Sequence, residues 1–105
     1  MELYLSLDNK DIYAGVKIES YGGRKSFELN QENLNLIGEN IGRFVKAERQ
    51  QLMNGGYENR KDAETITLTG ATAIPVYLTA FHAVVHSFHE VKYKNEMYKV
   101  TVAKH

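Results

Sequence analysis

The spacing of apolar residues changes along this chain from every second residue to every third or fourth, and this change constrains the fold most strongly. Apolar side chains at every second position are typical of half-buried strands, whereas a spacing of three to four is typical of helices. The first thirty residues follow the strand spacing in segments 3–7, 12–18 and 25–29, which are separated by polar or glycine-rich turns. These segments predict a three-stranded antiparallel meander.

The longest helical pattern covers residues 31–53. Asn30 can cap its first turn, Glu32 complements the positive end of the helix dipole, and Gly55-Gly56 marks its end. Along one face, apolar residues recur at helical spacing: Leu34, Ile37, Ile41, Phe44, Val45 and Leu52. A single apolar face predicts a helix that packs against a sheet.

The remainder of the chain predicts a strand, a helix and a hairpin. Apolar residues alternate with threonines over residues 64–69, and Pro75 fits only the first turn of a helix, which we expect to run to about residue 90. Residues 91–103 predict a hairpin. The 105 residues are therefore expected to form a single α+β domain, 1–105, in the order βββ-α-β-α-ββ, with a mostly antiparallel sheet packed against two helices.

Composition excludes several classes of protein. The chain has no cysteine, which removes disulfides and cysteine-zinc sites, and its thirteen basic and thirteen acidic side chains cancel. The sequence has no long apolar run and no basic, apolar leader at its start. We therefore expect a cytoplasmic protein that does not enter a membrane, and nucleic acid is a possible but not a favoured partner.

Three of the four histidines lie close together, at His82, His86 and His89. On the predicted helix their spacing would place them on one side, with the first and last about 10.5 Å apart along the axis. One metal ion could then take at most two of them, and the His-Glu-x-x-His order of metalloproteases is absent. The histidines are interpreted as residues at the edge of the core, as a contact surface, or as two metal ligands.

Two further groups of residues are candidate binding sites. The turn from Thr69 to Thr72 joins a predicted strand to a predicted helix, where backbone N–H groups and two hydroxyls could hold an anion, although no phosphate-loop motif occurs. Arg43 and Lys46 lie with Arg49 on one face of the first predicted helix. That face is interpreted either as ordinary solvated surface or as a patch for an acidic partner.

Tyrosines supply the last candidate surface. Tyr4 and Tyr13 occupy strand positions opposite in parity to the apolar residues, so they are predicted to project from the outer face of the sheet. Tyrosine gives a large contact area with a polar tip and is enriched at interfaces. The outer face could be exposed sheet or a docking surface.

These observations favour a non-enzymatic binding module without a cofactor. We expect it to bind a protein partner and to form a homo-oligomer, most simply a dimer. Small domains without cysteine or catalytic motifs are common among host-directed inhibitors of phages and mobile elements, so that type is the leading hypothesis. The alternatives are a metal-dependent hydrolase using two of His82, His86 and His89, and a binder of small anionic ligands at Thr69–Thr72.

Overall fold

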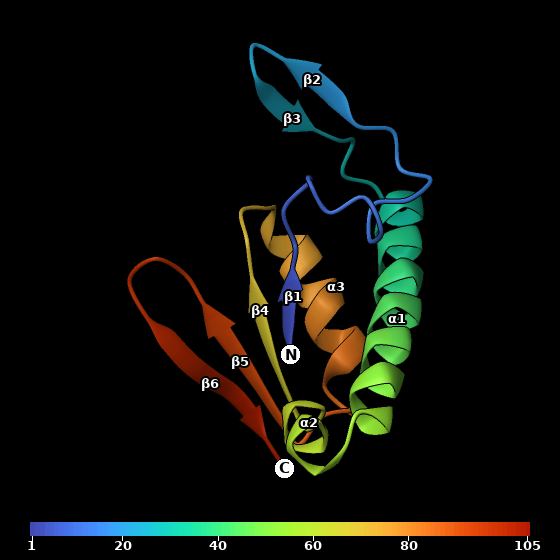
Figure 1. Ribbon diagram of the computed structural model, residues 1–105. Helices are drawn as coiled ribbons and strands as arrows, with labels where there is room; N and C mark the ends of the chain where they lie inside the picture. Colours follow the sequence, from blue (N-terminus) through green and yellow to red (C-terminus); the bar gives the residue numbers. More distant parts are fainter.

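The computed structural model describes the backbone of residues 1–105 and all side chains except those of residues 57–59. Its main sheet has the strand order β1-β4-β5-β6, and a separate antiparallel hairpin pairs β2 with β3 (Figure 1). The elements are β1 (Glu2–Tyr4), β2 (Glu19–Tyr21), β3 (Arg24–Ser26), α1 (Gln31–Asn54), α2 (Tyr57–Asp62), β4 (Thr65–Thr69), α3 (Ile74–Val84), β5 (Glu90–Lys94) and β6 (Lys99–Lys104). The predicted α+β class is confirmed.

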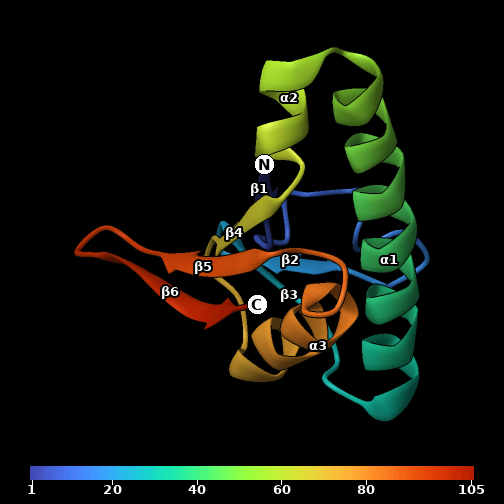
Figure 2. The ribbon, with the colours of Figure 1, turned by 90° about the horizontal axis from the view of Figure 1, so that it is seen from below.

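The main sheet is built from two strand–helix–strand crossovers that share β4. β1 and β5 each pair with β4 in parallel, and the connections between these strands contain α1 and α3 respectively. Such crossovers are right-handed in nearly all proteins, so two that step in the same direction place their helices on one face. Figures 1 and 2 show α1 and α3 side by side on one face of the sheet.

The last strand reverses direction. β6 pairs with β5 antiparallel, and their hairpin projects away from the helices (Figure 2). Two of the three pairings in the main sheet are thus parallel, and the expected antiparallel arrangement holds only for the hairpins β2–β3 and β5–β6.

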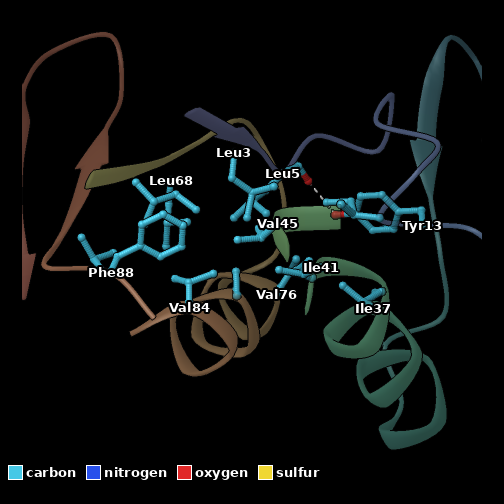
Figure 3. Packing of buried hydrophobic residues seen from close by; sticks show 14 of the residues in the cluster. Leu3, Leu5, Tyr13, Ile37, Ile41, Val45, Leu68, Val76, Val84 and Phe88 are labelled. Carbon is cyan, nitrogen blue, oxygen red and sulfur yellow. Dashed lines mark hydrogen bonds between the residues drawn. The ribbon is translucent and has the colours of Figure 1, made fainter. Parts of the chain in front are cut away.

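The core lies between the sheet and the two helices (Figure 3). Leu3, Ile66 and Val91 contribute one fully buried side chain from each of the three parallel strands, and α1 and α3 cover them. Asn30 caps α1 through a hydrogen bond that its side chain accepts from the backbone N–H of Asn33, as the sequence predicts. Among the described residues, no helix is both long enough and apolar enough to cross a membrane.

The predicted meander of the first thirty residues is wrong. β1 pairs with β4, and residues 8–16 form successive turns in place of a second strand. Ile12, Tyr13 and Val16 are nevertheless buried, so the apolar alternation reflects side chains that point from turns into the core. Asn40 of α1 holds this segment, because its side-chain amide donates to the carbonyls of Ile12 and Ala14 at 3.1 and 2.8 Å.

The second helix is shorter than predicted. α3 ends at Val84, and a turn over residues 85–87 brings Phe88 into the core before β5 begins. Residues 85–90 are therefore not helical, because the chain must leave the helix axis to return to the sheet beside β4. This turn redirects two of the three clustered histidines.

Candidate functional site

The carboxyl ends of the three parallel strands meet at one edge of the sheet, where they border a cavity of about 670 Å³. Both crossovers step in the same direction, so the sheet has no point where its strand order reverses, and the cavity is instead enclosed by Tyr77 of α3 and by the tip of the hairpin that follows β5. We call this space the edge cavity, and its lining residues are Tyr4, Thr69, Gly70, Ala71, Tyr77, Tyr93, Lys94, Asn95, Glu96 and Met97. It brings together β1, β4, β5, the first turns of α3 and the tip of the β5–β6 hairpin.

Aromatic rings form one wall of the edge cavity. The ring of Tyr93 on β5 meets the ring of Tyr77 on α3 nearly edge-on, with 5.4 Å between centroids. The ring of Tyr98, which does not line the cavity, lies 6.0 Å from that of Tyr93. Tyr4 enters from β1 and is half exposed. The cavity therefore offers flat apolar ring surfaces together with phenolic hydroxyl groups.

Gly70 shapes the floor of the edge cavity. Its φ of +110° is a conformation that residues with a side chain rarely adopt, and a Cβ atom there would lie 2.8 Å from the backbone nitrogen of Ser6. The hydroxyl of Tyr77 donates to the carbonyl of Gly70 and so ties α3 to the end of β4. Burial, with smaller contributions from neighbouring tyrosines, raises the pKa of Tyr77 to about 12.

This raised pKa predicts an alkaline loss of stability. Because the pKa of Tyr77 is near 10 in the unfolded chain and about 12 in the folded protein, the stability contributed by the neutral phenol is complete below pH 10. It is lost as pH rises from 10 to 12. Unfolding in urea followed at pH 9, 10.5 and 12 should show this decline, and the decline should be smaller in a Tyr77→Phe variant. An equal decline in the two proteins would contradict the assignment.

Hydrogen bonds hold the remaining walls in place. The side chain of Asn95 accepts from the backbone N–H groups of Met97 and Tyr98 at 2.8 and 3.0 Å, which orders the hairpin tip. The hydroxyl of Thr69 donates to the carbonyl of Lys94 at 2.8 Å and links β4 to β5. The walls of the edge cavity are therefore formed before any ligand arrives, which lowers the entropic cost of binding.

The predicted anion-binding hydroxyls are both engaged inside the protein. Thr69 is buried and bonded to Lys94 as described, and the hydroxyl of Thr72 lies 2.8 Å from that of Tyr13. Lys94 is the cation at the cavity, and its ammonium group lies 3.0 Å from a carboxylate oxygen of Glu2 on β1. The threonine side chains thus support the walls of the site.

The histidine cluster does not form the predicted stripe. His82 lies on the last turn of α3, whereas His86 and His89 follow the helix in the connection to β5, and all three are exposed. Within the part of the chain that the structure describes, no group of three or more histidine and acidic side chains is placed to hold a metal ion. The metal-dependent hydrolase therefore lacks the pair of histidine ligands that a longer helix would have placed on one face.

Of the two predicted outer tyrosines, only Tyr4 faces outward. Leu3 and Leu5 on either side of it are fully buried, as expected for alternation along a strand end. The prediction for Tyr13 is wrong, because Tyr13 is only 3% exposed and its hydroxyl donates to the carbonyl of Leu5 at 2.6 Å (Figure 3). Since residues 8–16 are turns, strand parity does not apply to Tyr13.

The basic face of α1 is smaller than predicted. Arg43 and Lys46 are exposed, and the guanidinium group of Arg43 donates to the side chain of Asn40. Arg49 is half-buried, stacks at 5.2 Å over the ring of Phe88 and donates to a backbone carbonyl. The third basic residue therefore stabilises the fold, and a patch for an acidic partner would depend on Arg43 and Lys46.

Sequence reasoning missed most of the edge cavity. Tyr77, Tyr93 and Lys94 lie on different elements, and only parallel pairing of β4 with β5 brings them together. The glycine that follows the predicted strand 64–69 was the available signal, since it marks the strand-to-helix turn at such an edge. Comparisons of the chain with protein-family models, with curated proteins and with solved structures find no match.

Proposed function

We propose that the protein is a non-enzymatic binding module whose ligand occupies the edge cavity. The observation that carries this proposal is the position of the cavity, at the carboxyl ends of three parallel strands and between preformed walls. A volume of about 670 Å³ lies within the range of about 300–1,000 Å³ of small-molecule sites. The absence of cysteine is compatible with a reducing compartment, and we propose the cytoplasm as the location.

The lining favours a ligand with a flat ring and a polar periphery. Tyr4, Tyr77 and Tyr93 supply ring faces and edges, and such surfaces bind planar rings by stacking. The charged lining residues, Lys94 and Glu96, are opposite in sign, and Lys94 is already paired with Glu2, so the side chains do not select a strongly charged ligand. Nucleosides, which combine a planar base with hydroxyl groups, are the ligand class that fits this lining best.

Binding of nucleosides tests the proposal. Calorimetric titration with each common nucleoside and its 5′-monophosphate should detect at least one complex, and Tyr93→Ala should weaken it about 10-fold or more because one stacking ring is lost. The matched control is Tyr21→Ala, since Tyr21 is 91% exposed at the end of β2, outside the edge cavity, and should leave affinity unchanged. Thermal melting of both variants verifies that they are folded.

The comparison of nucleoside with monophosphate reports on Lys94. If the phosphate of the ligand reaches this ammonium group, the monophosphate should bind more tightly than its nucleoside, and Lys94→Gln should abolish the difference. Failure of every probe to bind at millimolar concentration, or unchanged affinity in Tyr93→Ala, would contradict the proposed function.

A further inference from the structure

The two edges of the main sheet differ in length. β1 forms one edge with three residues, whereas β6 forms the other with six and is the longest strand of the sheet. An edge strand carries backbone N–H and C=O groups that can pair with a further strand, and proteins often protect such an edge with proline, a short strand or a covering segment. β6 contains no proline, all its residues except Ala103 are exposed, and β5 is the only described strand that pairs with it. The edge at β6 is therefore open to a further strand.

The hydrogen bonds of the β5–β6 hairpin identify the residues of β6 whose backbone groups point outward. Asn95 is bonded to Tyr98 at one end of the hairpin and His105 to His89 at the other, through backbone hydrogen bonds of 3.0 and 2.8 Å. Hydrogen-bonded and non-hydrogen-bonded pairs alternate along an antiparallel ladder. With the observed register and its one irregularity, the residues whose N–H and C=O groups face away from β5 are Lys99, Thr101 and Lys104.

The side chains of the same three residues lie on the open face of the sheet, opposite the helices. Each pairs with a residue of β5 that alternates with the buried Val91 and therefore faces away from the core. The charged side chains on this face of the hairpin are those of Glu90, Lys92, Lys94, Lys99 and Lys104. The face is thus positive, although the chain as a whole is neutral. Lys94 is paired with Glu2 of β1, and among the described side chains the other three lysines form no ion pair.

The opposite face of β6 is apolar at its centre. Val100 pairs with Tyr93, whose ring contacts Tyr77 of α3, so the side chain of Val100 lies on the helix side of the sheet. It is 44% exposed, in keeping with the projection of the hairpin beyond the helices (Figure 2). A strand added to β6 would therefore meet lysines on one face and valine on the other.

We infer that β6 binds an extended segment of a partner protein in which acidic and apolar residues alternate. Such a segment adds a strand to the sheet, because its backbone pairs with the outward groups of β6. Its carboxylates then face the lysines, and its apolar side chains lie beside Val100. Opposite charges directly across two strands stabilise their pairing. The inference is independent of the edge cavity, since no residue of β6 lines that cavity.

The lysines disfavour a second copy at this edge, and the backbone disfavours a nucleic acid. Two fully overlapped β6 strands, paired antiparallel about a two-fold axis, would place Lys99 opposite Lys104 at both ends, and like charges weaken such pairing. A phosphate backbone could contact the lysines, but it carries only acceptors. It would leave the outward carbonyl groups of β6 and the side chain of Val100 without partners.

Titration of the isotope-labelled protein with an end-capped peptide of alternating glutamate and valine tests the inference. Backbone amide shifts should be saturable and centred on residues 99–104, whereas the matching lysine–valine peptide should cause none. Lys99→Glu should weaken binding of the glutamate–valine peptide about 10-fold, because an attractive cross-strand pair becomes repulsive. The matched control is Lys46→Glu, which makes the same change at an exposed position of α1 and should leave affinity unchanged.

Thr101→Pro distinguishes strand addition from attraction between charges alone. Because the N–H group of Thr101 faces away from β5, proline removes a donor for the added strand and leaves the β5–β6 ladder intact. Affinity for the glutamate–valine peptide should fall about 10-fold or more. The matched control is Thr101→Val, which also loses the hydroxyl bond to Glu90 but keeps the N–H group and should bind normally.

Four results would overturn the inference. The glutamate–valine peptide could cause no saturable shifts, or Thr101→Pro and Thr101→Val could bind it equally well. A single-stranded oligothymidylate could bind more tightly than the peptide at residues 99–104, which would make the edge a nucleic-acid site. Shifts at the same residues on raising the protein concentration without peptide would instead indicate a second copy.

Discussion

Replacing Gly70 with alanine is expected to lower the free energy of unfolding by about 3 kcal/mol or more. The φ of +110° would place a side chain in a strained conformation that costs about 1–3 kcal/mol. The added methyl group would also approach the backbone nitrogens of Ser6 and Leu5 to 2.8 and 3.0 Å, and overpacking of this kind costs about 1–3 kcal/mol. Backbone atoms cannot rotate away, so the ends of β1 and β4 must separate.

Gly42 provides a control with the same chemical change. It lies inside α1 with φ in the ordinary range, and a Cβ atom there meets nothing within 4 Å. Gly42→Ala should therefore raise stability by about 1 kcal/mol, since alanine favours a helix interior over glycine by that amount. Urea unfolding followed by circular dichroism measures both changes, and effects of the same sign would contradict the role assigned to Gly70.

Replacing Asn40 with alanine is expected to lower the free energy of unfolding by about 2–3 kcal/mol. This side chain is only 5% exposed and donates to the carbonyls of Ile12 and Ala14. Without it the buried carbonyl of Ile12 loses its partner, which costs about 1–3 kcal/mol, and a small cavity adds to the loss. Because Asn40 provides hydrogen bonds from α1 to residues 12 and 14, amide hydrogen exchange should also increase in residues 8–16.

Gln50→Ala is the matched control for Asn40→Ala. It truncates an exposed amide side chain on the same helix, where alanine is at least as favourable, so stability should change by less than about 0.5 kcal/mol. If the two variants unfold at the same urea concentration, Asn40 does not hold the turn segment.

Local signals in the sequence predicted some elements well. The helix at 31–53 is confirmed as α1 because its cap, its apolar face and its glycine end all lie within the segment itself. The strand at 64–69 and the final hairpin are likewise found as β4 and as β5 with β6. These elements depend on neighbouring residues, so periodicity and turn chemistry are sufficient to find them.

The errors concern features that depend on distant residues. Alternation over residues 12–18 cannot distinguish a strand from a series of turns whose apolar residues point into one core, and the deciding contacts come from Asn40. The end of α3 at Val84 depends on where β5 must pair, since no glycine or proline interrupts residues 76–90. The apolar spacing typical of a helix continues past Val84, so the sequence predicted a helix at His86 and His89, where the structure has none.

The candidate site shows the same limit. Thr69 was selected from its place in a strand-to-helix turn, and it does lie at the edge cavity, although its hydroxyl stabilises the sheet. Tyr93 and Lys94 reach the edge cavity only because β5 pairs in parallel with β4. The sequence predicts a mostly antiparallel sheet and so does not reveal this pairing. The alternation of side chains along a strand correctly predicted that Tyr4 faces outward, because residues 2–4 do form a strand.

Mapping of backbone amide shifts tests the central claim most directly. Titration of the isotope-labelled protein with the nucleosides and 5′-monophosphates named above should give saturable shifts at residues 69–71 and 93–97 and at Tyr77, which line the edge cavity. Shifts should be small along α1 and at the tip of the β2–β3 hairpin. Saturable shifts centred on the groove between α1 and α3, or no saturable shifts with any probe, would contradict a ligand site at the carboxyl edge of the sheet.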